Sequence, residues 1–307
     1  MTPALEVYLH ARRAEIERAL ETILPVPPDC PAPVASAMRY SLLAGGKRLR
    51  PILCLAGAEA VGGRREMALP AACAIELIHT YSLIHDDLPA MDNDTLRRGR
   101  PTLHVVAGEG MAILGGDGLL AEAFHLLARE PQTDEPGLLA RKLRVIGIVA
   151  HAAGPVGMVG GQAIDLAGVT PSPGGGPPAR LDADGLARMH AKKTGALIRA
   201  AAQAGAIMGG GTEAEVDAID RAAADLGLAF QIVDDILDVE AGSADLGKTA
   251  GKDAAAGKPT YPALWGIGAS RRLAADCLDR AEAALRAGGL EDPHLLAIGR
   301  WIVARSH

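Results

Sequence analysis

Residues 71–92 read Ala-Ala-Cys-Ala-Ile-Glu-Leu-Ile-His-Thr-Tyr-Ser-Leu-Ile-His-Asp-Asp-Leu-Pro-Ala-Met-Asp. The apolar, alanine-rich first part of this stretch is typical of a helix. The helical run ends at Asp86 and Asp87, and a proline then removes a backbone donor. Asp92 lies too far along a straight helix to share their face. We therefore predict that 88–91 leaves the helix and returns Asp92 to the other two carboxylates.

A second acidic segment, 231–238, reads Gln-Ile-Val-Asp-Asp-Ile-Leu-Asp. On a helix, Asp234, Asp235 and Asp238 share one face with Gln231, while apolar residues cover the other faces. Two carboxylates about 4 Å apart repel by roughly 4 kcal/mol at an effective dielectric of about 20. Mg²⁺ relieves this repulsion, because it prefers oxygen ligands and bridges carboxylates to substrate phosphates. One such run alone could be a solvated helix face, but two in apolar surroundings favour a metal site.

The composition indicates a large helical protein. The chain has 307 residues, of which 49% are hydrophobic, 22% charged and 3% aromatic, so it can bury a large core. A net charge of −6 argues against a broad nucleic-acid-binding surface. The cysteines show no paired spacing, and we expect neither a secretion signal nor an apolar stretch of membrane-spanning length. The chain is therefore predicted to be cytoplasmic, without stable membrane insertion.

Glycine pairs separate the helical segments, strand-like alternation is scarce, and no repeat of solenoid period is present. The one low-complexity piece, at 171–178, is expected to be a flexible surface loop. We predict a single all-α domain over 1–307, with helices at 3–22, 31–43, 50–61, 66–87, 111–129, 136–152, 181–208, 213–239, 261–286 and 293–305.

Basic residues cluster near the acidic segments. The motif Gly-Gly-Lys-Arg-Leu-Arg-Pro at 45–51 joins two expected helices, and its cations and backbone N–H groups suit a phosphate ester. Arg-Arg-Gly-Arg follows the first aspartates at 97–100, and Lys-Lys-Thr stands at 192–194. Any one of these cations alone could be a solvated surface residue. Together they indicate an anionic ligand shared with metal, which the basic end at 305–307 could cap.

These motifs resemble those of the trans-isoprenyl diphosphate synthases. The likeness rests on both acidic segments and on 46–51, 97–99, 193–195 and 257–258, and it extends from about residue 34 to residue 266. It is greatest to bacterial-type farnesyl diphosphate synthases. The resemblance implies an all-α isoprenoid-synthase bundle around a deep central cavity, and a homodimer. It also implies head-to-tail (1′-4) condensation of isopentenyl diphosphate with dimethylallyl or geranyl diphosphate.

The resemblance also implies roles for individual residues. The ligands of Mg²⁺, with three ions present once substrate is bound, would be Asp86, Asp87, Asp92, Asp234, Asp235 and Asp238. The allylic diphosphate would contact Arg97, Lys193 and Lys258, with Thr194, Gln231 and Lys248 close by. Isopentenyl diphosphate would be held by Gly46, Lys47, Arg50, His79 and Arg98. The residues expected to act most directly in catalysis are Asp86, Asp87, Asp92, Asp234, Lys193 and Arg97.

Product length in this family depends on what blocks the cavity below the first aspartates. Tyr81 and Ser82 precede Asp86 by five and four residues, and should point into that cavity. A bulky ring at Tyr81 favours a fifteen-carbon, farnesyl product, although the ring could instead be an ordinary packed aromatic. The spacing of 88–91 also fits the farnesyl type. The alternative is a geranylgeranyl or longer product.

Three rival classes are distinguished by their motifs. A class I terpene cyclase would show an N-D-x-x-S-x-x-x-E second motif and more aromatic residues. A head-to-head prenyl transferase would lack the motif at 46–51. A non-catalytic subunit of a synthase heteromer tends to lose one acidic cluster, whereas this chain has both. Tight Mg²⁺-dependent diphosphate binding without turnover would favour that last class.

Overall fold

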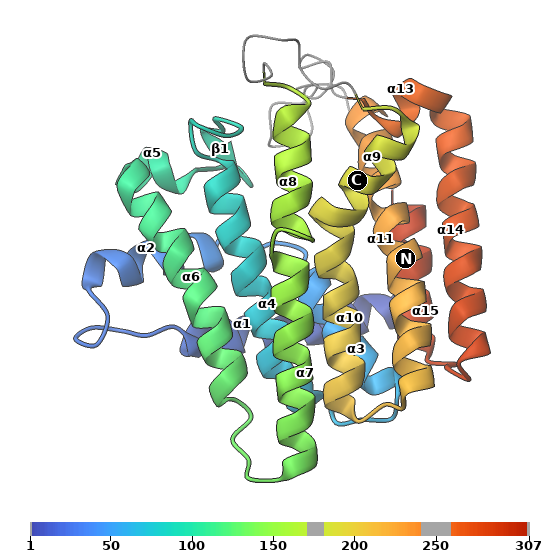
Figure 1. Ribbon diagram of the computed structural model, residues 1–307, viewed down its shortest axis with the longest axis horizontal. Helices are drawn as coiled ribbons and strands as arrows, with labels where there is room; N and C mark the ends of the chain where they lie inside the picture. Colours follow the sequence, from blue (N-terminus) through green and yellow to red (C-terminus); the bar gives the residue numbers. More distant parts are fainter. Residues whose placement is uncertain (1, 171–180, 241–258, 306–307) are drawn as a thin grey trace.

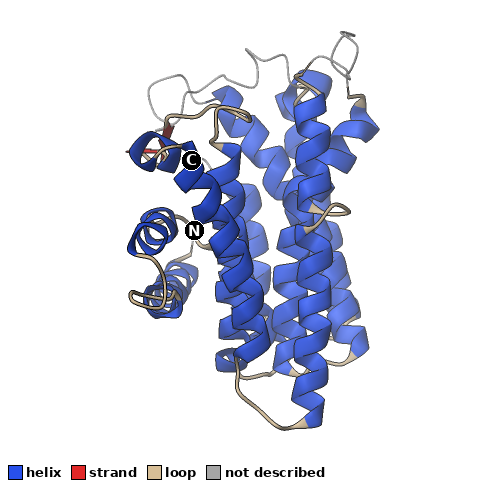
Figure 2. Cartoon of the chain, turned by 60° about the vertical axis from the view of Figure 1, so that its left-hand side comes forward, coloured by secondary structure: helices blue, strands red, loops and turns tan. Residues whose placement is uncertain are grey.

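The computed structural model describes residues 2–170, 181–240 and 259–305. Helices dominate this part of the chain, and Figure 2 shows one small pair of strands beside them. The prediction of an all-α fold is confirmed. The helices are α1 (Pro3–Ile23), α2 (Ala32–Leu42), α3 (Leu49–Ala60), α4 (Arg65–Asp86), α5 (Leu103–Ala107), α6 (Glu109–Arg129), α7 (Pro136–Ala153), α8 (Met158–Ala167), α9 (Ala183–His190), the π-helix η1 (Ala191–Gly195), α10 (Ala196–Gly209), α11 (Glu213–Glu240), α13 (Tyr261–Trp265), α14 (Ile267–Ala287) and α15 (Pro293–Ala304).

Most predicted helices begin and end within a few residues of the observed ones, but α5 and α8 have no predicted counterpart. Helix α8 is hard to predict because it contains Gly160 and Gly161, and glycine disfavours helix interiors. The structure explains both glycines. A Cβ at Gly160 would overlap the carbonyl oxygen of Pro155. A Cβ at Gly161 would overlap the backbone of Lys193, so glycine allows α8 to approach η1 closely.

Two predicted helices are interrupted. The one predicted at 181–208 consists of α9, η1 and α10, and η1 contains Lys193 and Thr194. Single π-turns are rare and occur often at functional sites. The one predicted at 261–286 breaks at Gly266, whose φ of 78° suits glycine and ends α13 before α14 begins.

A two-stranded hairpin follows the first acidic segment and was not predicted. Strand β1 (Leu96–Arg97) pairs antiparallel with β2 (Arg100–Pro101). The turn residues Arg98 and Gly99 have φ values of 54° and 73°. Positive φ at both positions is the pattern of a type I′ turn, which matches the twist of the flanking strands.

Helix α4 is central to the core and is flanked by α3, α6 and α10 (Figure 1). Every residue at positions 71–78 is buried, as expected for a helix that packs on most of its faces. Small residues bring α3 and α10 together, because a Cβ at Gly205 would overlap the carbonyl of Cys54. The described helices share one contiguous apolar core. That 1–307 forms a single domain stays a prediction, and the predicted loop at 171–178 lies outside the described residues.

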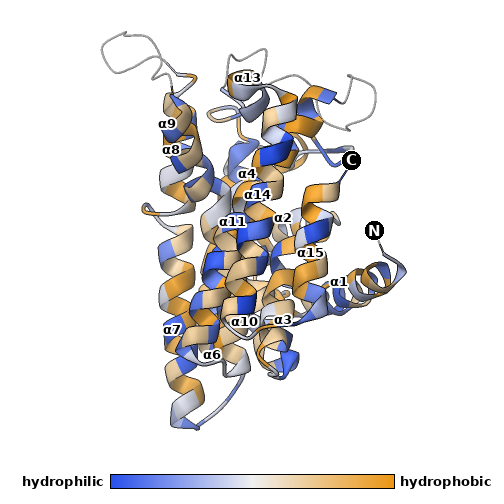
Figure 3. Ribbon diagram, turned by 90° about the vertical axis from the view of Figure 1, so that its right-hand side faces the viewer, coloured by the Kyte–Doolittle hydropathy of each residue, from blue (hydrophilic) through white to orange (hydrophobic). Residues whose placement is uncertain are grey.

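Three helical stretches are long and apolar enough to cross a membrane by length and composition: Arg65–Asp86, Glu109–Arg129 and Pro136–Ala167. The expectation of no such stretch was wrong, because core helices rich in alanine and leucine reach the same length and hydropathy. In α4 the fold buries 67% of the apolar window, but in the other two stretches only 39% and 33%. Apolar side chains therefore remain exposed along α6, α7 and α8, and hydrophobic residues are visible along α7 in Figure 3.

The chain reversals bring both acidic segments and η1 to one end of the bundle. The last turns of α4, α8 and α11 point toward the end where η1, α13 and the hairpin lie, which is the upper end in Figure 1. Helix α10 leaves this end and α11 returns to it. The two acidic segments, far apart in sequence, are thereby placed at the same end of the molecule.

Candidate active site

The first acidic segment leaves its helix as predicted. Helix α4 ends at Asp86, and the chain turns back so that the backbone N–H of Asp92 donates to the carbonyl of Asp86 over 2.9 Å. The N–H of Asp94 likewise donates to the carbonyl of Asp87 over 3.1 Å. Asn93 occupies the turn with a φ of 51°. The predicted return of Asp92 is confirmed at the level of the backbone.

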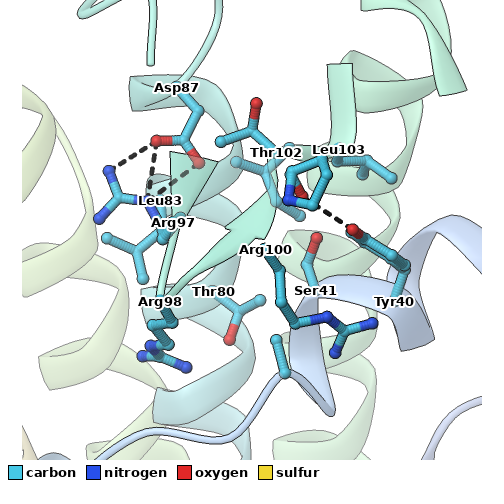
Figure 4. Close-up of a pocket in the computed structure, with 13 residues that line it drawn as sticks. Tyr40, Ser41, Thr80, Leu83, Asp87, Arg97, Arg98, Arg100, Thr102 and Leu103 are labelled. Carbon is cyan, nitrogen blue, oxygen red and sulfur yellow. Dashed lines mark hydrogen bonds and ion pairs between the residues drawn. The ribbon is translucent and has the colours of Figure 1, made fainter. Parts of the chain in front are cut away.

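Arg97 forms a bidentate ion pair with Asp87 through two of its nitrogens. Its Nε lies 2.8 and 2.9 Å from the two carboxylate oxygens, and its Nη2 lies 2.6 Å from Oδ1 (Figure 4). This pair lines a pocket between α2, α4 and the hairpin, where the hydroxyl of Tyr40 donates to the carbonyl of Pro101 over 2.8 Å. Bidentate arginine–carboxylate contacts are strong and directional. Both carboxylate oxygens of Asp87 thus accept hydrogen bonds from Arg97. The role of Asp87 as a metal ligand stays a prediction.

The charged form of the Asp86 carboxylate is disfavoured by its surroundings. Burial raises the pKa of its carboxyl to about 6, and the neighbouring charges of Asp92 and Asp87 act in the same direction. The cations of Lys193 and Arg97 act in the opposite direction without cancelling the increase. Because the charged form is disfavoured by desolvation and by like charges, a bound cation would stabilise it.

The second acidic segment is approached by the basic end of the chain. Arg305 Nη2 lies 2.9 Å from Asp234 Oδ1 and donates to the carbonyl of Phe230 over 3.1 Å. The guanidinium carbon stands 4.2 Å from the centroid of the Phe230 ring. Only 2% of the Arg305 side chain is exposed. Arg305 is therefore part of the site, which no motif had indicated for that residue in particular.

Asp235 faces away from solvent and takes part in a chain of hydrogen bonds. Its Oδ1 accepts from Gln231 Nε2 over 3.2 Å, and its Oδ2 accepts from the backbone N–H of Tyr261 over 3.0 Å. The amide oxygen of Gln231 accepts from the Thr194 hydroxyl over 3.1 Å. The structure therefore brings together Thr194, Gln231 and the second acidic segment, as the resemblance implied.

Lys193 is held by a carboxylate that the motifs did not include. Its Nζ lies 2.6 Å from Oδ2 of Asp165, a residue of α8 that is 7% exposed. The charge of Lys193 in turn acts on Asp86, so η1 and the end of α4 face each other. The sequence signal for Asp165 was a single acid in the run 158–167, where Gln162 is the one other polar side chain, and it is weak without the prediction of α8.

The loop between α2 and α3 is fixed by a buried ion pair. Arg48 Nη1 lies 2.7 Å from Oε1 of Glu76 in α4, and Arg48 Nη2 donates to the carbonyl of Leu42 over 2.7 Å. Arg48 is 3% exposed and Glu76 is 2% exposed. Arg48 also adopts a φ of 51° at the start of α3. This arginine therefore shapes the loop and, unlike its neighbours, is not available to a diphosphate.

Arg98 packs on the same loop. It donates to the carbonyl of Gly45, and a Cβ at Gly46 would lie 2.6 Å from its guanidinium carbon. A side chain at position 46 would therefore displace the Arg98 guanidinium, and the φ of 133° at Gly46 favours glycine. The contact joins the hairpin to the loop, and so brings Gly46 and Arg98 together as the resemblance implied.

His79 accepts a hydrogen bond from Arg50, with 3.2 Å between Nε2 and Nη1. Because arginine can only donate, Nε2 of His79 carries no proton. Burial and the charges of Arg50 and Arg98 hold the pKa of His79 well below its ordinary value. His79 is therefore neutral and orients Arg50.

Lys47 is close to both Arg305 and Asp234, since burial and Arg305 lower its pKa while Asp234 raises it.

Tyr81 is a buried side chain, 7% exposed, whose ring meets the His85 ring edge to face at 5.7 Å and 78°. Burial, and then the charge of Asp86, raise the pKa of Tyr81. His85 in turn lies 3.2 Å from the carbonyl of Ile113 in α6. The Ser82 hydroxyl donates to the carbonyl of His79 over 2.8 Å, within its own helix. Tyr81 of α4 is thus held against His85, which contacts α6. The hydroxyl of Ser82, in contrast, is hydrogen-bonded within its own helix.

The oxygen-rich chemistry of the two segments fits Mg²⁺. The raised pKa of Asp86 and the Arg305 guanidinium beside Asp234 both indicate carboxylates that attract positive charge. Within 2–170, 181–240 and 259–305, however, no three His, Cys, Asp or Glu side chains lie together as a metal site. The predicted ligands Asp92 and Asp238 remain predictions. Lys248 and Lys258 lie outside the described residues.

A helical bundle with two aspartate segments and many cations at one end has the attributes of an enzyme that binds diphosphates. The family model of polyprenyl synthetases matches residues 31–285. The chain is 44% identical to the geranylgeranyl diphosphate synthase of Cyanophora paradoxa, over 99% of this chain and 97% of that protein. It is 45% identical to the dimethylallyltranstransferase of Fischerella ambigua, over 98% of this chain and 83% of that one.

Solved structures agree with this assignment. The crystal structure of an FPP/GFPP synthase from Zymomonas mobilis superposes with a TM-score of 0.86 at 40% identity, over 99% of this chain and all of the other. The chain therefore belongs to the polyprenyl synthetase family, as a trans-isoprenyl diphosphate synthase, and it is a prenyltransferase.

Proposed function

We propose that the protein catalyses the Mg²⁺-dependent head-to-tail condensation of isopentenyl diphosphate with an allylic diphosphate. The observation that carries this proposal is the convergence of both acidic segments with two groups of cations. Lys193 acts electrostatically on Asp86, and Asp234 acts on Lys47 and Arg50. The hydrogen bond from Thr194 to Gln231 links these two pairs, and together these contacts support one shared site for the four motifs.

The cations divide into two groups that suit two diphosphates. Arg97 and Lys193 lie beside the first acidic segment, where they would bind the allylic diphosphate and support its departure. Lys47 and Arg50 lie on the α2–α3 side with Arg98, where they would hold isopentenyl diphosphate. Mg²⁺, when bound, would neutralise charge that develops on the leaving diphosphate. Exclusion of water from the apolar interior would protect the allylic cation from capture as an alcohol.

The enzyme class can be tested directly. Purified protein would be incubated with Mg²⁺, labelled isopentenyl diphosphate and either dimethylallyl or geranyl diphosphate, and the products would be dephosphorylated and sized. Elongated allylic alcohols with both primers are expected. Tight Mg²⁺-dependent diphosphate binding by folded protein without elongation would contradict the proposal and favour a non-catalytic subunit.

The product proposed is farnesyl diphosphate, and its support is Tyr81. The ring is buried beside Asp86 and braced by His85, so it can block elongation below the first aspartates. A second candidate, geranylgeranyl diphosphate, is favoured by the names of relatives, among them the geranylgeranyl pyrophosphate synthase 3 of Arabidopsis thaliana at 48% identity. The sized products of the wild-type protein distinguish fifteen from twenty carbons.

Tyr81→Ala is expected to shift the main product to twenty carbons or more, because removal of the ring opens space next to the allylic site. Sizing of the dephosphorylated products gives the readout, and Tyr81→Met is a milder variant with less cost of cavity formation. Ser82→Ala is the matched control, since its hydroxyl is bonded within α4 and little volume is lost. An unchanged product profile in both Tyr81 variants would show that the Tyr81 ring does not limit product length.

A homodimer is proposed from the apolar side chains exposed along α6, α7 and α8 and in the turn between α7 and α8. These are Ile113, Leu114, Leu139, Leu143, Val156 and Val159. Apolar patches of this kind often mark an interface between proteins. A second copy of the chain is the occupant we propose. The cytoplasmic location and the lack of nucleic-acid partners and of membrane insertion remain predictions from composition and charge.

Leu143→Glu is expected to halve the mass measured by light scattering, because a buried charge without a partner strongly disfavours an interface. Leu143 is 71% exposed in the single chain. Val7→Glu is the control, since Val7 is 70% exposed but lies on α1. Equal masses for wild type and Leu143→Glu, with Val7→Glu also unchanged, would place the interface elsewhere or exclude a dimer.

A further inference from the structure

We propose that Asp235 is a positioning residue that ties η1 and α13 to the second acidic segment, and that it is not a metal ligand. This inference rests on the proposed function for its catalytic consequence. The structural part, that Asp235 holds η1 and α13 in place, does not depend on the activity, because it rests on hydrogen bonds within the protein. Asp235 is 7% exposed, and both of its carboxylate oxygens accept hydrogen bonds from protein groups.

The first tether leads from Asp235 to η1. Gln231 lies one turn before Asp235 on α11, and its amide donates to Asp235 Oδ1 while its oxygen accepts from the Thr194 hydroxyl. Thr194 is adjacent to Lys193 in η1. Hydrogen bonds to a charged acceptor are among the stronger ones in proteins. The carboxylate of Asp235 therefore helps to fix the backbone that carries Lys193.

The second tether leads from Asp235 to α13. The backbone N–H of Tyr261, at the start of α13, donates to Asp235 Oδ2. The Tyr261 ring stacks on Trp265 at 5.3 Å and lies 5.6 Å from the ring of His190, the residue before η1. Tyr261 is thus held by its amide and by two ring contacts.

Together these contacts hold η1 at both of its ends. His190 packs on Tyr261 before η1, and Thr194 bonds to Gln231 near its end. Lys193 lies between them and is held by Asp165 as well. An aspartate that organises this frame is placed to set the position of Lys193, which faces Asp86 across the site.

Asparagine at position 235 separates the two roles. Its amide can accept from Tyr261 and donate to Gln231 after the Gln231 amide rotates, so the tethers survive without the carboxylate charge. Asp235→Asn should therefore keep the Mg²⁺ concentration for half-maximal activity within about threefold of wild type. Asp234→Asn, which removes a predicted metal ligand, should raise it by roughly tenfold or more. A similar increase in Asp235→Asn would overturn the positioning role.

Asp235→Ala breaks both tethers. We expect roughly tenfold faster hydrogen exchange of the Tyr261 amide in protein free of metal and substrate, measured on a peptide that spans α13, because the lost bond has a charged acceptor. Its KM for the allylic diphosphate should rise by about tenfold, with rescue by asparagine in both measurements. Unchanged exchange in Asp235→Ala would overturn the inference. The exchange measurement needs no turnover, so it can succeed or fail separately from the proposed enzyme activity.

Discussion

Asp86→Ala is expected to lower kcat by about 10³-fold, the scale of loss seen when a preorganised electrostatic contact to a developing charge is removed. Asp86 is the carboxylate on which the neighbouring aspartates and Lys193 act together, so it lies where the site's charges converge. Steady-state turnover at saturating Mg²⁺ and substrates gives the measurement. Turnover within a few-fold of wild type would refute the metal assignment of the first segment.

The stability of a second, uncharged variant, Asp86→Asn, distinguishes the loss of a metal ligand from unfolding. The pKa of Asp86 is raised from an ordinary 3.8 to about 6, so between those values the folded protein holds a proton that the unfolded chain lacks. Stability from this group is present at low pH and is lost as pH rises through about 6. At neutral pH, metal-free Asp86→Asn should therefore be more stable than wild type by about 3 kcal/mol. A less stable, inactive variant would instead indicate a structural role.

Lys193→Met is expected to lower kcat/KM for the allylic diphosphate by roughly 10²- to 10³-fold. The ammonium is held 2.6 Å from the buried Asp165 and acts on Asp86, so its removal deletes a fixed cation beside the first acidic segment. Truncation of one member of such a pair commonly costs about 2–5 kcal/mol. Initial rates at varied allylic diphosphate and constant Mg²⁺ give the readout.

Lys192→Met is the matched control, because it changes the neighbouring lysine of the same π-helix. The Lys192 side chain is half-buried, and its ammonium donates to the backbone carbonyl of Val156 over 2.6 Å. Its kcat/KM should stay within about threefold of wild type, because this contact is to a backbone carbonyl and not to a carboxylate of the site. Equal losses in the two variants would mean that η1 as a whole, and not the Lys193 charge, is responsible.

Local sequence patterns were sufficient for most helices and for the acidic segments. Helix α4 and its end at Asp86 followed from an apolar, alanine-rich run and a proline, and the shared face of 231–238 followed from helical spacing. Helix α8 was missed since its glycines lower local helix propensity. That propensity is overridden by the close approach of Gly161 to Lys193, which depends on a segment distant in sequence.

The sequence by itself determined the helical class, the two acidic segments and the motifs that identify the family, because these depend on composition and short spacings. Only the tertiary structure decided which charged side chains are available to bind metal or diphosphate and which are paired within the protein. Arg48 pairs with Glu76, Asp87 with Arg97, and Asp235 with Gln231 and Tyr261. Desolvated charges must find partners wherever the fold places them. Those partners come from other helices, so no local pattern could distinguish a structural aspartate or arginine from one that faces the diphosphates.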